Sequence, residues 1–239
     1  MRPSRLSHAF RAGLDALFPP RCLVCDAPAW DGSLPGLCAA CADAMPFIRG
    51  ACGRCGRDAG GLGGPGGCVV CRDEATDLDG VVAPLRYRDL ARDLVLSLKF
   101  HRRTPAAVPL GLLMADALRS AGRPGDLLVP VPLSKQRFRE RGHNQADDLT
   151  LVLAPALDLE RDARALSRSR HTLTQSGLGH GRRRRNPRGA FRAAKPRVEG
   201  RCVLLVDDVV TTGATASSCA RALKRAGAVR VVLAAACRA

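Results

Sequence analysis

Residues 201–223, RCVLLVDDVVTTGATASSCARAL, decide how this chain folds. The apolar run at residues 203–206 is typical of a buried strand that is covered on both faces of a parallel sheet. Two carboxylates, Asp207 and Asp208, follow this run, and the small, hydroxylated residues 211–215 come soon after. Small and apolar residues then recur at helical spacing. The order of strand, acidic pair, small loop and helix predicts an α/β protein.

The loop after the acidic pair has the chemistry of a phosphate site. A helix N-terminus presents unpaired N–H groups and a positive dipole end, and both attract a phosphate. Gly213 lets the backbone approach closely, and the neighbouring Thr hydroxyls donate further hydrogen bonds. Carboxylates at a strand end accept sugar hydroxyls and help to hold Mg²⁺, so the segment suits a ribose 5-phosphate. The alternative is a strand that ends in solvated Asp residues before a Thr-rich helix cap.

Strand-like and helix-like segments alternate over the last two thirds of the chain. Such alternation predicts a parallel sheet with helices on both faces. We expect strands at residues 81–85, 127–133, 203–206 and 229–235, and helices at residues 89–100, 105–120 and 146–156 and after residue 215.

Eight of the eleven cysteines form four Cys-x-x-Cys pairs. Twelve residues separate the first pair from the second and also the third from the fourth, so the segment is a repeat of two units. Two such pairs complete a tetrahedral Cys₄ site, which favours zinc over disulfides or redox chemistry. Sequential pairing gives one ion to Cys22, Cys25, Cys38 and Cys41 and the other to Cys52, Cys55, Cys68 and Cys71, whereas a cross-braced pairing stays open.

Each predicted zinc site is closed by four thiolates, so both ions are expected to be structural. The segment is rich in Gly and poor in large apolar residues, and metal must therefore supply much of its folding free energy. The other cysteines, Cys202, Cys219 and Cys237, fall in predicted strands and a helix and are interpreted as ordinary buried residues.

Two basic segments lie between the predicted elements. Residues 134–145, SKQRFRERGHNQ, carry alternating cations at the carboxyl end of a strand, where open α/β sheets bind ligands. This basic loop either binds a pyrophosphate or is a solvated surface. Residues 168–192 contain still more Arg together with Gly, and they show little periodicity. They predict a mobile loop that closes over a ligand or contacts nucleic acid.

The net charge of +16 over 239 residues favours polyanionic partners, namely nucleic acid, pyrophosphate or both. Because only 3% of the residues are aromatic, nucleic-acid binding would depend on phosphate contacts more than on base stacking. No run approaches the roughly 18 apolar residues of a membrane helix. The amphipathic N-terminus lacks the features of a secretory signal and predicts a short helix. We therefore expect a cytoplasmic protein without membrane insertion.

Four motifs, taken in order, resemble the ComF family: the paired Cys-x-x-Cys repeat, VPVPLSKQRFRERGHNQA, RSRHTLTQSGL with RRNPRGAF, and VLLVDDVVTTGAT. The resemblance covers nearly the whole chain. It implies a double zinc ribbon with a short N-terminal helix at residues 1–75 and a type I phosphoribosyltransferase-like α/β domain at residues 76–239. It also implies that the ligand is 5-phosphoribosyl-1-pyrophosphate (PRPP) with Mg²⁺, and that the protein acts in natural competence, where incoming single-stranded DNA is handled.

The resemblance assigns roles by position. The PRPP-binding residues would be Asp207, Asp208, Val209, Thr211, Thr212, Gly213, Ala214 and Thr215, with the acidic pair on the ribose hydroxyls. The pyrophosphate loop would contribute Ser134, Lys135 and Arg137, and the mobile loop would contribute Arg168, Arg170, Thr172, Gln175 and Arg185. This chain departs from the family at His143, where an aromatic residue is common.

Three functions are consistent with these residues. An enzyme would transfer the phosphoribosyl group of PRPP to an unidentified acceptor, using positioning and electrostatics rather than a side-chain nucleophile. A nucleic-acid-binding module would hold single-stranded DNA, and its PRPP site would be regulatory or vestigial. A PRPP sensor would recruit protein partners such as a competence helicase or a recombination mediator.

Overall fold

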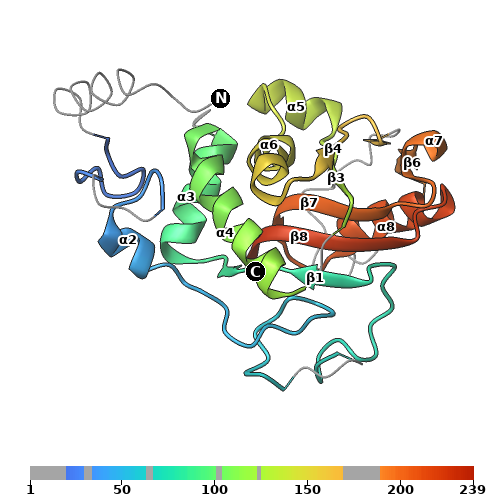
Figure 1. Cartoon of the computed structure of the whole chain (residues 1–239), viewed down its shortest axis with the longest axis horizontal. Coiled ribbons are helices and arrows are strands. Elements are labelled where there is room, and N and C mark those ends of the chain that lie inside the picture. The colour runs from blue at the N-terminus through green and yellow to red at the C-terminus, as the bar shows by residue number, and fades with distance from the viewer. Residues whose placement is uncertain (1–19, 30–33, 63–66, 101–103, 123–124, 169–188) are drawn as a thin grey trace.

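Two long parallel strands, β7 (Cys202–Val210) and β8 (Arg230–Arg238), form the centre of the molecule (Figure 1). They pair in a register that sets Val203 opposite Val231. Both strands are almost continuous runs of Val, Leu and Ala because both faces of the sheet are covered. The computed structural model describes residues 20–29, 34–62, 67–100, 104–122, 125–168 and 189–239.

The parallel sheet has the strand order β1-β8-β7-β3-β4, and β2 also pairs with β8. The outer strands are short: β1 (Gly80–Val82), β2 (Leu85–Arg86), β3 (Leu127–Pro130) and β4 (Glu160–Arg161). The single strand predicted at residues 81–85 is therefore two strands, which are separated at Pro84, a residue without an N–H for the ladder. Strand β3 ends at Pro130 instead of residue 133.

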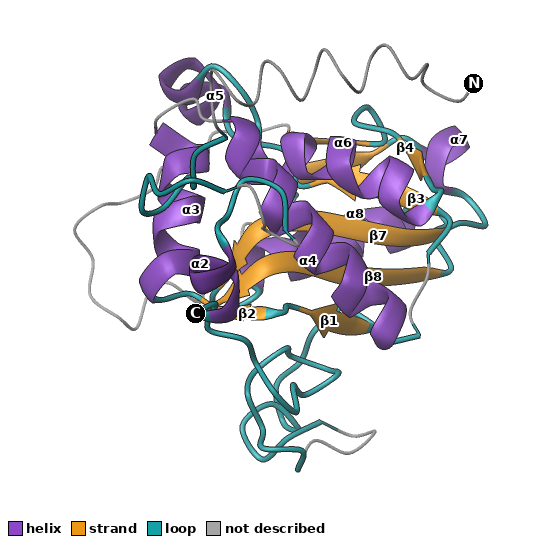
Figure 2. Ribbon diagram, turned by 60° about the vertical axis from the view of Figure 1, so that its left-hand side comes forward, coloured by secondary structure: helices purple, strands orange, loops and turns teal. Residues whose placement is uncertain are grey.

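Helices cover both faces of the sheet, as predicted. One face carries α3 (Asp89–Phe100), α4 (Ala107–Ser120), which follows the 3₁₀ turn η1 (Thr104–Ala106), and α6 (Gln145–Leu157). Helix α8 (Ala214–Arg225) covers the other face (Figure 2). Successive strand residues point to opposite faces. Accordingly, Leu204 and Val206 of β7 pack with the first group of helices, whereas Val203 and Leu205 pack with α8.

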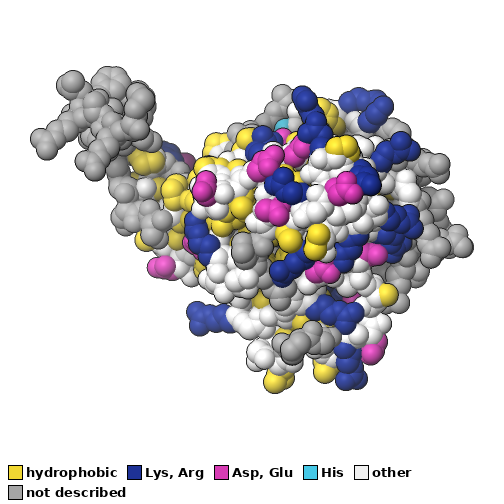
Figure 3. All heavy atoms as spheres, turned by 45° about the vertical axis from the view of Figure 1, so that its right-hand side comes forward, with side chains coloured by type: hydrophobic (Ala, Val, Ile, Leu, Met, Phe, Trp, Pro, Cys, Tyr) yellow, Lys and Arg dark blue, Asp and Glu magenta, His cyan; other side chains and the backbone are white. Residues whose placement is uncertain are grey.

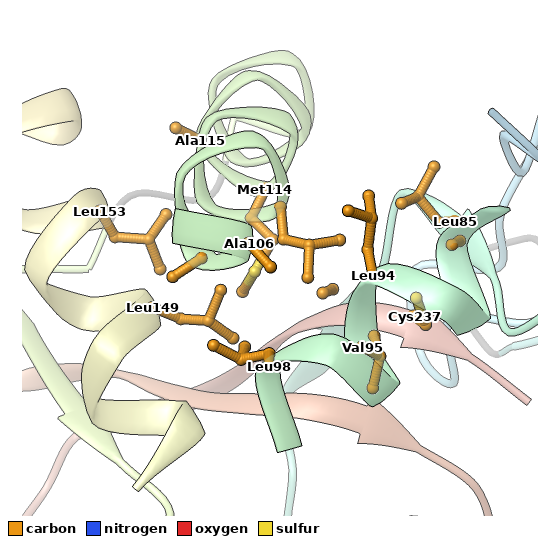
Figure 4. Packing of buried hydrophobic residues seen from close by; sticks show 14 of the residues in the cluster. Leu85, Leu94, Val95, Leu98, Ala106, Met114, Ala115, Leu149, Leu153 and Cys237 are labelled. Atoms are coloured by element: carbon orange, nitrogen blue, oxygen red, sulfur yellow. The ribbon is translucent and has the colours of Figure 1, made fainter. Parts of the chain in front are cut away.

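The core beneath α3 and α6 fixes the position of α3. Leu94, Val95 and Leu98 on α3 are fully buried, and Leu98 lies beside Leu149 of α6 (Figure 4). Burying a side chain of this size contributes about 1.5–3 kcal/mol. Helix α3 is therefore anchored on the sheet mainly by its apolar face.

The basic segment after β3 is a helix, α5 (Lys135–Arg141), and the prediction of a loop was wrong. Ser134 caps the helix by accepting a hydrogen bond from the backbone N–H of Arg137 at 3.2 Å, and Gly142 ends it with a φ of 78°. The basic segment was predicted as a loop because its cations follow the carboxyl end of a strand. However, Lys, Gln, Arg and Glu are all good helix formers, and the cap decides the local structure.

The ends of the segment predicted as a mobile loop, residues 168–192, are also regular. Strands β5 (Leu166–Arg168) and β6 (Phe191–Ala193) form an antiparallel pair, and the short helix α7 (Lys195–Val198) follows. Arg168 thus lies at the end of a strand rather than in a loop. The other predicted loop residues, Arg170, Thr172, Gln175 and Arg185, lie outside the described residues, and so does the predicted N-terminal helix.

The two cysteine-rich units contact different parts of the sheet domain. The first, which contains α2 (Ala39–Asp43), packs its Cys22, Leu37 and Met45 into the same core as α3 and α4. The second lies below β1 in Figure 1, where Val81 donates a backbone hydrogen bond to Gly53 at 3.1 Å. Among the helices that the structure describes, none is long and apolar enough to cross a membrane.

Candidate functional site

The phosphate loop, residues 211–215, joins the carboxyl end of β7 to the N-terminus of α8. Gly213 is the N-cap of α8 and has a φ of 74°, a left-handed backbone conformation that residues other than glycine rarely adopt. The first turn begins with a hydrogen bond from Ser217 N to Gly213 O at 2.8 Å. The first amides of this twelve-residue helix therefore point toward the loop, the arrangement that binds anions at helix N-termini.

The acidic pair lies inside β7 rather than after it, so the two carboxylates start on opposite faces of the sheet. Asp208 lies on the face that α3 covers, where its Oδ2 is 3.1 Å from the Nζ of Lys99. Both side chains of this ion pair are largely buried, with 17% of Lys99 and 11% of Asp208 exposed. The Asp207 carboxylate accepts a hydrogen bond from the backbone N–H of Asp208 at 2.9 Å.

Asp207 is the carboxyl group whose ionisation is most perturbed within the site. Burial and the neighbouring charge of Asp208 raise its pKa to about 7, against the opposing influence of Lys99 and Arg137. A carboxyl with such a pKa is only partly ionised at neutral pH, and a cation or a hydroxyl donor that binds beside it will favour the charged form. Perturbed carboxyls of this kind are concentrated at functional sites.

A hollow of about 400 Å³ connects the acidic pair, the phosphate loop and a rim of cations. Its lining includes Asp207, Asp208, Val209, Thr211, Thr212, Gly213, Ala214 and Thr215, all predicted from the sequence, together with Arg137 and Arg168. Ser134 serves as the cap of α5 and does not line it, and Lys135 lines a different hollow beside Phe138. Lys99, Tyr87 and Arg141 also line the site, and the sequence analysis missed all three.

The positions of these three residues at the site depend on tertiary contacts. Lys99 is in the last turn of α3, and its ammonium lies 5.9 Å from the centre of the Tyr87 ring. The Arg141 guanidinium stacks 5.4 Å from the ring of Phe100, and burial lowers its pKa in spite of the charge of Asp208. The one local signal was the placement of a Lys at the end of an amphipathic helix, next to a fully buried Leu98.

His143 links three elements close to the site. Its Nε2 lies 2.8 Å from the carbonyl oxygen of Leu98 on α3, and its Nδ1 lies 3.0 Å from the carbonyl oxygen of Arg141. Nε2 is also 3.5 Å from the Asp148 carboxylate on α6. His143 therefore holds the carboxyl end of α3, and with it Lys99, against the α5–α6 junction. Burial raises the pKa of Asp148, and the charge of His143 opposes that rise.

The eight predicted zinc ligands form two clusters, and the grouping is sequential rather than cross-braced. Within the clusters, Sγ–Sγ distances are 3.7 Å for Cys25–Cys38 and 3.8 Å for both Cys52–Cys71 and Cys55–Cys68. A tetrahedral zinc with Zn–S bonds of about 2.3 Å would separate its sulfurs by about 3.8 Å, whereas a disulfide would bring them to about 2 Å. The thiol geometry therefore fits a four-sulfur zinc site in each unit.

The local electrostatics favour a thiolate at one cysteine of each cluster above all, whereas burial and the neighbouring sulfurs raise the pKa of Cys41 and raise that of Cys55 to about 12. Burial tends to raise the pKa of Cys22, but backbone N–H groups of Cys25, Cys38 and Val24 outweigh it and lower the pKa to about 6. Cys52 shows the same balance, with a pKa lowered to about 6 by amides in its own unit. Thiolates are the form that coordinates zinc. Since four thiolates close each site, a bound zinc would supply structural cross-linking rather than a catalytic position.

The second zinc unit lies next to the phosphate loop. Arg238, only 7% exposed, donates from Nε to the carbonyl of Cys55 at 3.1 Å and from a terminal nitrogen to the carbonyl of Val210 at 3.0 Å. The same guanidinium also bonds the carbonyl of Thr211. A hollow of about 480 Å³, lined by residues of both segments, separates the unit from the loop.

Comparison with known proteins gives the family. A model described as "Double zinc ribbon domain" matches residues 13–73, and one described as "Phosphoribosyl transferase domain" matches residues 152–239. The "DNA utilization protein YhgH" of Escherichia coli K12 is 35% identical over 225 residues, which cover 92% of this chain and 97% of that protein. The chain belongs to the ComF family. "Competence protein F" of Haemophilus influenzae is 32% identical over a region that covers 80% of this ComF protein and 86% of the relative.

Two further matches cover less of the chain. "Competence protein ComFC" of Bacillus subtilis is 32% identical over 106 residues, which are 42% of this ComF protein and 39% of the relative. Among solved structures, glutamine PRPP amidotransferase from B. subtilis is 18% identical, with a TM-score of 0.38 over 58% of this chain and 30% of its own. The relatives confirm the predicted family, and the strand order and the cysteine grouping of the structure confirm the α/β fold and the two cysteine clusters.

Proposed function

We propose that this ComF protein binds PRPP in the hollow at the carboxyl end of β7 and acts in the cytoplasm in DNA uptake or DNA processing. The observation that carries the proposal is the shared hollow, in which a helix N-terminus, two carboxylates and several cations converge. The names of the relatives, which refer to DNA utilization and to competence, support the biological setting.

Each part of PRPP has a complementary group in the hollow. The 5-phosphate would accept hydrogen bonds from the first amides of α8 and from the hydroxyls of Thr211 and Thr215. The ribose hydroxyls would donate to the acidic pair, and the diphosphate would face Arg137 and Arg168 on the rim. Carboxylate and phosphate oxygens are the ligands that Mg²⁺ prefers, and the ion would neutralise charge on the diphosphate.

The same arrangement suits phosphoribosyl transfer. A nucleophile on the acceptor would form a bond to the anomeric carbon while the bond from that carbon to the diphosphate oxygen breaks, and the electron pair would leave with pyrophosphate. The rim cations would stabilise the charge that develops on the leaving group, which is the kind of contribution that accelerates such reactions most.

Calorimetric titration of Mg²⁺-PRPP into the zinc-loaded protein tests the site. We expect saturable binding by the wild type and its loss in the double variant Asp207→Asn, Asp208→Asn. Asp116→Asn is the matched control, because this carboxylate on α4 is 71% exposed and pairs only locally with Arg119. A double variant that binds PRPP as tightly as the wild type would refute the assignment.

A second candidate function is binding of single-stranded DNA, and exposed aromatic residues on α5 and at the end of α3 favour it. Phe138 is 51% exposed and Phe100 is 64% exposed, and both lie among cations, with Arg141 stacked on Phe100. On the face shown in Figure 3, dark blue Lys and Arg side chains are spread among fewer acidic ones. Exposed aromatic rings beside cations are the usual platform for unpaired bases. A competence helicase or a recombination mediator would be a further partner in this setting.

The salt dependence of DNA affinity tests this second function. Neutralisation of several phosphates predicts that the logarithm of the association constant falls linearly and steeply as the logarithm of the salt concentration rises. Phe138→Ala should weaken the binding of an oligonucleotide by about 1–3 kcal/mol if bases stack on the ring. Leu151→Ala on α6 is the control, since it removes an apolar side chain of similar exposure, 54%, from a different helix. An affinity that does not change with salt would contradict the proposal.

A further inference from the structure

The Lys99–Asp208 ion pair is not needed to hold α3 in place. Leu94, Val95 and Leu98 anchor the helix with no exposed surface, and His143 fixes its last turn through the carbonyl of Leu98. Ion pairs that are largely buried seldom add net stability, because desolvation of both charges offsets their attraction. The position of this pair at the binding hollow therefore calls for a functional explanation.

The ammonium of Lys99 already occupies the position of a cation at the acidic pair. It lies 3.1 Å from Asp208 and also acts to lower the pKa of Asp207, ahead of Arg137 in that effect. A free Mg²⁺ that approached Asp208 would have to displace this ammonium or share the carboxylate with it. In the unliganded protein the ammonium of Lys99 therefore neutralises the charge of Asp208 without any metal.

Lys99 lines the same hollow as Arg137 and Arg141, so its ammonium can reach a ligand there. A lysine side chain has four flexible carbons and a compact ammonium with three donors, of which Asp208 uses one. The side chain is 17% exposed, and this exposed part is on the hollow. Diphosphate oxygens are stronger competitors for such an ammonium than water is, because charge-assisted hydrogen bonds to them are short and strong.

We propose that Lys99 exchanges partners when PRPP binds: in the free protein its ammonium neutralises Asp208, and in the complex it binds the diphosphate oxygens while Asp208 accepts a ribose hydroxyl. This inference rests on the proposed function and names a further ligand-binding residue for it. The exchange makes the acidic pair a poor site for Mg²⁺ alone, so the metal binds only together with the diphosphate.

The test compares wild-type protein with Lys99→Met, using Mg²⁺ alone and Mg²⁺-PRPP as titrants. We expect Lys99→Met to lower PRPP affinity by roughly tenfold to a hundredfold, the usual loss for one charge-assisted hydrogen bond. We also expect it to bind Mg²⁺ alone more tightly than the wild type, because Asp208 is then uncompensated. Lys99→Arg should restore exclusion of free Mg²⁺ and part of the PRPP affinity. Lys224→Met is the control, since this lysine pairs with Asp79 on the surface.

The outcomes separate this inference from the proposed function. If the pair were only structural, Lys99→Met would free Asp208 and leave PRPP affinity unchanged or higher, which would overturn the exchange. A folded wild type that binds no PRPP would overturn the proposed function itself. Should Lys99→Met fail to fold, Lys99→Gln keeps an N–H donor for Asp208 and should show the same two changes. Unchanged affinities for both titrants in a folded Lys99→Gln protein would also refute the exchange.

Discussion

Arg238→Met should detach the second zinc unit from the phosphate loop. The guanidinium is buried at the end of β8 and bonds carbonyls of Cys55, Val210 and Thr211, so one side chain joins a zinc-ligand turn to the loop. Met preserves much of the apolar stem of Arg but offers no donor. The change therefore removes the connection while it largely retains the packing.

The size of the effect follows from the carbonyls that lose their partner. Thr211 is exposed, so water can replace the lost bond there. Val210 is buried, but its carbonyl also accepts the backbone N–H of Ala239 at 3.0 Å and stays satisfied. The partly buried carbonyl of Cys55 is left without a donor, and we expect a loss of about 1–3 kcal/mol in the free energy of unfolding. For a protein of this size the loss corresponds to a Tm lower by roughly 2–12 °C.

Two assays check this prediction: urea unfolding for stability and zinc release to a chromogenic chelator for the ribbon. In Arg238→Met, one of the two zinc ions should be released faster than in the wild type, and the other should be unaffected. Arg119→Met is the control, because Arg119 also bonds a backbone carbonyl but is 55% exposed, and its change should stay within about 0.5 kcal/mol. Wild-type stability together with unchanged release of both ions would show that Arg238 does not anchor the unit.

The remaining predictions concern metal content, pH and His143. Protein purified without chelators should contain two zinc ions per chain by elemental analysis, and fewer than one per chain would contradict the Cys₄ geometry. Folding raises the pKa of Asp207 to about 7. The contribution of this carboxyl to the free energy of unfolding is therefore fully present below about pH 4 and is lost as the pH rises through about 7. Asp207→Asn should therefore raise the Tm of the ligand-free protein at pH 8 more than at pH 5, and an equal shift at both would contradict this. His143→Phe should cost about 1–3 kcal/mol in urea unfolding, since the ring can no longer donate to the carbonyl of Leu98 or of Arg141, and a neutral result would contradict the linking role.

The sequence predicted best those features that depend on local periodicity and spacing. Helix α3 spans Asp89–Phe100, the range that its leucine spacing indicated, because the same residues form its buried face. The Cys-x-x-Cys spacing predicted the eight zinc ligands, and only the choice between sequential and cross-braced pairing needed the structure. Helix α5 was predicted as a loop because its seven residues offer no apolar periodicity, whereas the Ser134 cap acts through one hydrogen bond.

Contacts between distant segments were beyond the sequence analysis. Lys99 and Asp208 are separated by more than a hundred residues, and nothing in the local pattern of either one indicates the other. The role of Arg238 likewise depends on how the second zinc unit packs below β1. Only the packing of α3 on the sheet brings Lys99 and Asp208 together.

One feature of the acidic pair was nevertheless implicit in the sequence. Two consecutive residues of a strand must start on opposite faces, so Asp207 and Asp208 could never have equivalent surroundings once β7 extends to Val210. Asp208 faces α3 and obtains a cation from it, whereas Asp207 lies on the side of α8, where Cys219 is buried nearby and the raised pKa of that thiol partly reflects the Asp207 charge. In the proposed exchange the two carboxylates have different roles: Asp208 exchanges a lysine for a ligand, and Asp207, which is partly ionised near neutral pH, gains charge when a ligand supplies a donor. For this reason the two single substitutions should differ in how PRPP affinity depends on pH. Asp208→Asn, which retains Asp207, should show the steeper change in PRPP affinity near neutral pH.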